Sequence, residues 1–337
     1  MPFRNRSVVL GGVGLAVLLA IPLVVTQPHP QHVLIMIFLY ALMGIAWNLV
    51  GGYAGQVSFG HAVFFGTGAY TTTLLMTKAK ISPIIGMFAG GVVAAGIALI
   101  IGWGCFRLAG HYFAIATFTV GQMVQIIATQ WKYIGAAVGV YVPLDRQYQW
   151  WLTLQFKSKA GFYYVALLLL GAGLWLCWQI GRNRLGAYFR AIKGDPEAAR
   201  SLGIDIFRQK LYALMISAFV MAVVGGVFAQ YVLFIDPASV FDGALSIKVA
   251  LVAVLGGAGS LWGPVLGAAV LIPLNEYTSV MLGSSGSGLD LLLYGVLIVV
   301  VSVYQPDGLA GLWDRLFGAR GRILREKKVT ADAAARS

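Results

Sequence analysis

The polar residues best suited to specific chemistry lie in one interval, residues 182–210, of a chain that is otherwise strongly apolar. Within it, Asp195 is a favoured helix N-cap and Pro196 suits the first helical position. Gly203 then suits the left-handed conformation that commonly follows the end of a helix. Together these signals predict a short helix of about two turns that begins and ends at defined residues.

The residues between the two signals are suited to non-covalent docking. Glu197 and Arg200 would supply orienting charge, while the small Ala198 and Ala199 would let a partner approach closely beside Leu202. The alternative is an ordinary helix that lies on a membrane surface. The clear start and stop signals favour docking.

Two glycine-rich segments carry the other polar candidates. Residues 51–61 place three glycines within five positions, and residues 254–267 repeat the pattern of Gly-Gly, a further Gly and a serine. Such segments do not sustain a regular helix, and irregular backbone cannot face lipid, so each must face protein or a water-filled cavity. Paired broken segments point to a transport site near the bilayer centre. The residues predicted to line that route are Gly51, Gly52, Gly55, Gln56, Ser58, His61, Gly256, Gly257, Gly259 and Ser260.

Two more modest interpretations of these segments stay open. The glycines can serve only to let helices pack tightly, as small residues do in membranes. His61 can be a packing histidine whose hydrogen bonds are satisfied within the protein.

Motifs of catalysis are missing from the sequence. There is no Gly-x-x-x-x-Gly-Lys-Ser/Thr loop and no Gly-x-Ser-x-Gly elbow, and the four histidines and two cysteines have no metal-ligand spacing. We therefore predict that the chain is not an enzyme and itself binds no metal or cofactor.

Composition defines the fold class. Hydrophobic residues make up 59% of the chain and charged residues 11%, against about a quarter charged in soluble proteins. We predict an all-α, polytopic integral membrane helix bundle with glycine-broken helices. Segments of roughly 20 apolar residues give about ten spans. They are residues 8–25, 32–50, 59–76, 83–105, 112–128, 162–180, 211–232, 245–256, 262–282 and 289–304.

The distribution of positive charge predicts the topology. With the amino terminus inside, 17 of the 24 Lys and Arg residues fall on the cytoplasmic side, which predicts a multi-pass inner (plasma) membrane protein with both termini cytoplasmic. Residues 1–314 would form one transmembrane domain with a cytoplasmic loop at 181–210. Residues 315–337 would be a basic cytoplasmic tail near anionic lipid. The positive charge follows topology, so no nucleic acid partner is expected.

Several stretches resemble the permease subunits of branched-chain amino acid ABC importers, the LivH/LivM group. The Glu-Ala-Ala, three residues, Gly pattern of ABC permeases is present at 197–203. Residues 51–62 with 66–70, 107–117 and 256–264 are similar to signature stretches of this group, the last two to its LivM-type member. The resemblance spans residues 40–275.

The resemblance implies function and partners. It implies a subunit that translocates branched-chain or related amino acids beside a second, LivH-type permease. Two ATPase subunits, which use ATP and magnesium, would bind the chain at Asp195, Pro196, Glu197, Ala198, Ala199, Arg200 and Gly203. An extracytoplasmic binding protein would deliver substrate.

Other functions remain compatible with the sequence. Urea or short amides are alternative substrates within the group, and an ion-coupled secondary transporter acting alone is a different class. The latter would use Lys248 and Glu276, which are costly inside a membrane and should avoid lipid. A scaffold or receptor without transport is a third, weaker interpretation. The exact substrate, the identity of the partners and the resting conformation are not given by the residues.

Overall fold

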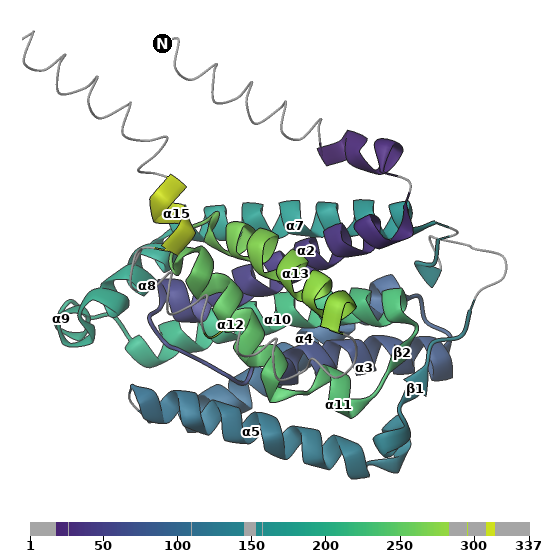
Figure 1. The fold of residues 1–337 in the computed structure, drawn as a ribbon. Helices are drawn as coiled ribbons and strands as arrows, with labels where there is room; N and C mark the ends of the chain where they lie inside the picture. Colours follow the sequence, from purple (N-terminus) through teal and green to yellow (C-terminus); the bar gives the residue numbers. More distant parts are fainter. Residues whose placement is uncertain are drawn as a thin grey trace, which may run out of the picture.

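The computed structural model describes residues 18–25, 27–108, 110–144, 153–156, 158–282, 295 and 308–313. Its elements are nearly all helical (Figure 1). They are α2 Pro28–Asn48, η1 Leu49–Tyr53, α3 His61–Ala79, α4 Pro83–Cys105, α5 His111–Gln130, η2 Lys132–Ile134, η3 Ala136–Val138, β1 Val140–Tyr141, α7 Lys159–Arg182, α8 Arg184–Gly194, α9 Pro196–Ser201, α10 Ile206–Val232, β2 Phe234–Ile235, α11 Pro237–Val240, α12 Gly243–Gly257, α13 Gly263–Leu282 and α15 Gly308–Trp313.

The long helices run between two opposite ends of one bundle. Helices α8, α9 and α15 lie at one end, which we name the α9 end, and β1 and β2 lie towards the other (Figure 1). Helix α5 forms one edge of the bundle and α7 the opposite edge, with α3, α4, α10 and α12 between them. Successive long helices therefore connect alternately at the two ends.

The all-α membrane class predicted from composition is confirmed, while the number of spans is tested only in part. Six helical stretches of the described chain are long and apolar enough to cross a membrane. They are Pro28–Tyr53, Pro83–Cys105, His111–Gln130, Lys159–Arg182, Ile206–Val232 and Pro237–Gly257. Helices α3 and α13, of 19 and 20 residues, match two further predicted spans in position but are not among these six. The predicted first span is described only from residue 18, and the predicted last span and basic tail lie outside the described residues.

One short β-ladder interrupts the helical pattern. Val140 pairs with Ile235 and Tyr141 with Phe234, in antiparallel register. The rings of Tyr141 and Phe234 lie 4.6 Å apart, so aromatic contact accompanies the backbone pairing. The ladder ties the long loop after α5 to the end of α10.

The centre of the bundle depends on helices that approach very closely. A Cβ added at Gly68 of α3 would overlap the carbonyl oxygen of Ala222 in α10, and one at Gly225 of α10 would overlap that of Phe65. Small residues permit such contact, which stabilises membrane helices through packing, since lipid supplies no hydrophobic drive between them. The close α3–α10 pair is therefore the core around which the other helices pack.

Enlarging a residue at this contact should separate the two helices. Gly225→Leu should lower stability by about 1–3 kcal/mol or more, because overpacking forces side chains and backbone to shift. The measurement is thermal unfolding of the detergent-purified protein. Gly171→Leu is the matched control, since Gly171 of α7 is exposed and has open space where a Cβ would be. Equal stability of the two variants would contradict the packing argument.

Candidate functional site

The capped helix has the local structure that the sequence predicts. The Asp195 carboxylate accepts hydrogen bonds from the backbone N–H groups of Glu197 and Ala198, at 2.8 and 3.1 Å. Pro196 is the first residue of α9, and Gly203 adopts φ +80°. The side-chain cap satisfies backbone donors that a helix start leaves free. Helix α9 is thus a small element with fixed ends at one end of the bundle (Figure 1).

The exposed face of α9 differs in one residue from the predicted docking surface. Ala198 is exposed and Leu202 is 80% exposed, but Ala199 is only 2% exposed. Neighbouring helical positions point about 100° apart, so Ala198 and Ala199 cannot both face a partner. Ala199 instead packs α9 onto its own chain. The face left open carries Pro196, Glu197, Ala198, Arg200, Ser201 and Leu202.

Helix α8, which precedes α9, was missed by the sequence analysis. Its residues Gly186, Phe189 and Ile192 are buried at spacings of three, so one face of α8 packs against the bundle. The same spacing of apolar residues was visible in the sequence within the polar interval. Helix α8 therefore anchors the chain from which α9 protrudes.

The two glycine-rich segments meet across one buried asparagine, Asn48. Its Nδ2 donates to the carbonyl oxygen of Ser260 at 2.8 Å, and its Oδ1 accepts from the backbone N–H of Gly259 at 2.7 Å. Asn48 is fully buried, and a Cβ at Gly52 would overlap its Oδ1. The glycines are therefore needed for this close approach. Asn48 directly precedes the first segment, but its type alone did not reveal the role.

The first segment bends less abruptly than the glycines predict. The regular α-helix ends at Asn48, two residues before the predicted end of this span, and the chain continues as one π-helical turn, Leu49–Tyr53, that contains Gly51 and Gly52. Irregular backbone begins only at Ala54 and lasts until α3 starts at His61. The indole of Trp47 occupies the space beside Gly51, which favours this wider turn.

Ser58 and His61 face the protein interior. Ser58 is 1% exposed and His61 is fully buried, and His61 Nε2 lies 3.0 Å from the hydroxyl oxygen of Ser217. Ser217 donates in turn to the carbonyl oxygen of Ala46 at 2.6 Å. This arrangement matches the packing interpretation of His61, and neither side chain lines an open route in this structure.

Both broken segments lie towards the α9 end of the bundle. Tyr53 ends the stretch that crosses from the opposite end, and Ala54 already lines a cavity beside Lys193 and Pro196. In the second segment, α12 ends at Gly257, against which Gly308 of α15 packs. The π-helical turn Leu49–Tyr53, which contains Gly51 and Gly52, prolongs the first crossing stretch as far as this end.

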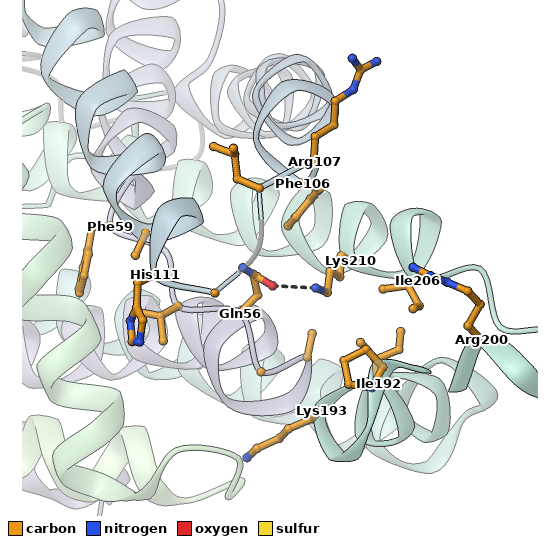
Figure 2. A pocket seen from close by; sticks show the side chains of 17 residues that line it. Gln56, Phe59, Phe106, Arg107, His111, Ile192, Lys193, Arg200, Ile206 and Lys210 are labelled. Carbon is orange, nitrogen blue, oxygen red and sulfur yellow. Dashed lines mark hydrogen bonds between the residues drawn. The ribbon is translucent and has the colours of Figure 1, made fainter. Parts of the chain in front are cut away.

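A cavity of about 740 Å³ opens between the first segment and the polar interval (Figure 2). Gly55 and Gln56 are the predicted route residues that line it. Its wall also includes Arg107, His111, Lys193, Arg200 and Lys210, and none of the described residues that line it is acidic. Such a lining creates a positive potential, which favours anionic groups. Lys210 donates to Oε1 of Gln56 at 2.7 Å, a contact drawn in Figure 2.

Comparison with known protein families agrees with this architecture. The family model described as branched-chain amino acid transport system / permease component matches residues 30–302. The chain belongs to this family. The matched range covers both glycine-rich segments, the cavity and α9.

Individual relatives are similar over most of the chain. LivM of Salmonella typhimurium, named a high-affinity branched-chain amino acid transport system permease protein, is 28% identical over 81% of this chain and 68% of its own length. LivH of Escherichia coli is 26% identical over 81% of this chain and 91% of its own length. A probable LivM of Methanocaldococcus jannaschii is 20% identical over 82% and 92%. No solved structure matches this permease.

The intramembrane charges Lys248 and Glu276 of this permease have aromatic or polar neighbours inside the bundle. The Nζ of Lys248 lies 5.0 Å from the ring centroid of Tyr40, a cation–π distance. Glu276 lies 3.9 Å from Nε2 of His32. Asp242 accepts from the backbone N–H of Ala244 and caps α12. Each charge therefore has a polar or aromatic neighbour within the bundle.

Removing the Asn48 amide should weaken the crossing of the two glycine segments. Asn48→Leu keeps a similar volume but leaves a buried carbonyl and a buried N–H without partners, at about 1–3 kcal/mol each. Asn48→Asp should also destabilise the permease, because it places a carboxylate oxygen opposite the Ser260 carbonyl oxygen at a fully buried position. Thermal unfolding of the purified permease would measure both. Equal stability of Asn48→Leu and the unchanged protein would show that the bridge contributes nothing.

Proposed function

We propose that this chain is a permease subunit of an ABC importer that moves branched-chain or related amino acids across the inner membrane. The observation that carries the proposal is the exposed, N-capped α9 at one end of a permease-family bundle. A short helix with fixed ends transmits force better than a flexible loop, because its backbone is already ordered. The positive charge of the interval around it supports a cytoplasmic position, with both termini on the same side.

The proposed complex contains several chains. A second, LivH-type permease would pair with this one, in keeping with its similarity to both LivM and LivH relatives. Two ATPase subunits would bind Asp195, Pro196, Glu197, Ala198, Arg200 and Gly203, with Ala199 holding α9 in place from behind. An extracytoplasmic binding protein would deliver substrate, and the basic residues 315–337 would contact anionic lipid.

The proposed mechanism gives this chain no bond-making step. ATP and magnesium would be used by the partner ATPases, whose closure would move α9 and change the packing of the helices. A helix bundle with close-packed contacts responds by switching between discrete arrangements. The route would thereby open alternately to either side of the membrane.

Substrate identity is the first test of the proposal. The complex purified through a tag on this chain and reconstituted with its binding protein should show ATP hydrolysis stimulated by leucine, isoleucine or valine. Urea and short amides serve as the competing panel. Stimulation by urea alone would overturn the amino acid assignment. Uptake by this chain alone, driven by an ion gradient, would instead favour a secondary transporter.

Charge reversal on α9 tests the docking surface. Glu197→Lys should reduce binding of the ATPase subunits about tenfold or more, since a like or misplaced charge at an interface typically costs at least 1.4 kcal/mol. Co-purification of the ATPases measures the effect, with membrane levels of the permease as reference. Lys132→Glu, a reversal of the same size on an exposed residue in η2, is the control. Equal loss in both variants would contradict a specific role for α9.

A further inference from the structure

Two lysines flank α9 in the sequence and reach the same loop of the bundle. Lys193 is the penultimate residue of α8, two positions before the Asp195 cap, and Lys210 lies in the second turn of α10. Both contact the irregular segment 54–60, at the consecutive residues Gly55 and Gln56. The chain that carries α9 is therefore attached to this segment from both of its sides.

The Lys210 contact is a charge-assisted hydrogen bond. Its Nζ lies 2.7 Å from Oε1 of Gln56, whose side chain is 5% exposed. A hydrogen bond to an ionised donor is about twice as strong as a neutral one. In Figure 2 the Lys210 side chain extends across the cavity to Gln56, whereas the guanidinium of Arg107 points away from this contact.

Lys193 packs closely against Gly55. A Cβ added at Gly55, which adopts φ +68°, would lie 3.1 Å from Cγ and 3.3 Å from Cα of Lys193. The Nζ of Lys193 reaches the second glycine segment, 3.1 Å from where a Cβ at Gly259 would be. Lys193 therefore lies across both segments close to the point where Asn48 joins them.

The far end of segment 54–60 is bonded to helices of the bundle. The N–H of Phe59 donates to Oγ1 of Thr117 in α5 at 3.1 Å. Directly beyond the segment, in the first turn of α3, the N–H of Ala62 donates to Oγ of Ser246 in α12 at 2.8 Å. The indole Nε1 of Trp47 in α2 donates to the carbonyl oxygen of Ser58 at 2.7 Å. A shift of the segment would therefore act on three helices at once.

The cavity makes these two lysine contacts mechanically important. Its walls include Ile192, Pro196 and Ile206 on the side of the polar interval and Ala54, Val57 and Phe59 on the side of segment 54–60. Open space separates parts of these walls, so the lysines bridge a region that is otherwise loosely packed. The cavity also leaves room for the α9 region to move relative to the bundle.

We propose that Lys193 and Lys210 are positioning residues that transmit movement of α9 to segment 54–60, and through it to α2, α5 and α12. The inference rests on the proposed importer function, because an outside motor must act on α9. It adds the specific contacts by which that action reaches the helices. Coupling of this kind requires an element that both sites displace, and segment 54–60 is that element.

The first test measures substrate transported per ATP hydrolysed in the purified complex, with leucine as substrate. Lys210→Met and Gln56→Leu should each lower this ratio about tenfold while assembly and basal ATP hydrolysis persist. The double variant should be no worse than either single one, because both remove the same contact. Lys210→Arg should retain most of the coupling, and Lys193→Ala should lower it.

Arg208→Met is the matched control for this test. Arg208 is a basic residue two positions before Lys210 in the same helix, with a largely exposed ion pair to Asp205. Its loss should leave the ratio unchanged, as exposed pairs contribute little. An unchanged ratio in Lys210→Met, or additive effects of Lys210→Met and Gln56→Leu, would overturn the proposal.

A second test needs neither substrate nor ATP. Asp195→Ala removes the α9 cap, and in the membrane-reconstituted permease it should increase hydrogen exchange at residues 54–60 as well as at α9. In the Lys193→Ala/Lys210→Met background the cap removal should affect α9 alone. If Asp195→Ala left hydrogen exchange at residues 54–60 unchanged in a chain that keeps both lysines, the link would be refuted. Because this readout is independent of transport, it separates failure of the link from failure of the importer assignment.

Discussion

The structure depends on one constraint, which is that irregular backbone within a membrane bundle must find its hydrogen bonds inside the protein. Asn48 meets this constraint for the second glycine segment with a single amide that bonds Gly259 and Ser260. Trp47 and Thr117 meet it for the first segment. The glycines have a complementary role, since their missing side chains let these donors and acceptors approach.

The constraint explains why the breaks in the helices and the polar interval that contains α9 lie at the same end of the bundle. A turn between two crossing helices must leave the helical ladder somewhere, and polar residues concentrate where the backbone does so. Segment 54–60 therefore lies beside the polar interval that contains α8 and α9, with a positively lined cavity between them. These two features therefore place α8 and α9 beside the turn that connects α2 with α3.

Much of this organisation was predictable because its causes are local. The cap at Asp195, the proline at 196 and the left-handed Gly203 are properties of neighbouring residues, and the structure has all three. Apolar length likewise predicted most helices within a few residues. The burial of Ala199 and the amphipathic α8 follow from helical periodicity, which was present in the sequence but not used.

The sequence by itself thus determined a polytopic helical membrane protein, the capped α9 and the two places where helices are interrupted, since each follows from hydropathy or local conformational preference. Only the tertiary structure decided which residues form hydrogen bonds with the chain at those interruptions. Asn48 and Ser260 are separated by 212 positions, and Gln56 and Lys210 by 154. No local rule pairs such residues, because their contact is set by how the helices between them pack. The same packing turned His61 inward and placed the glycine segments near α9.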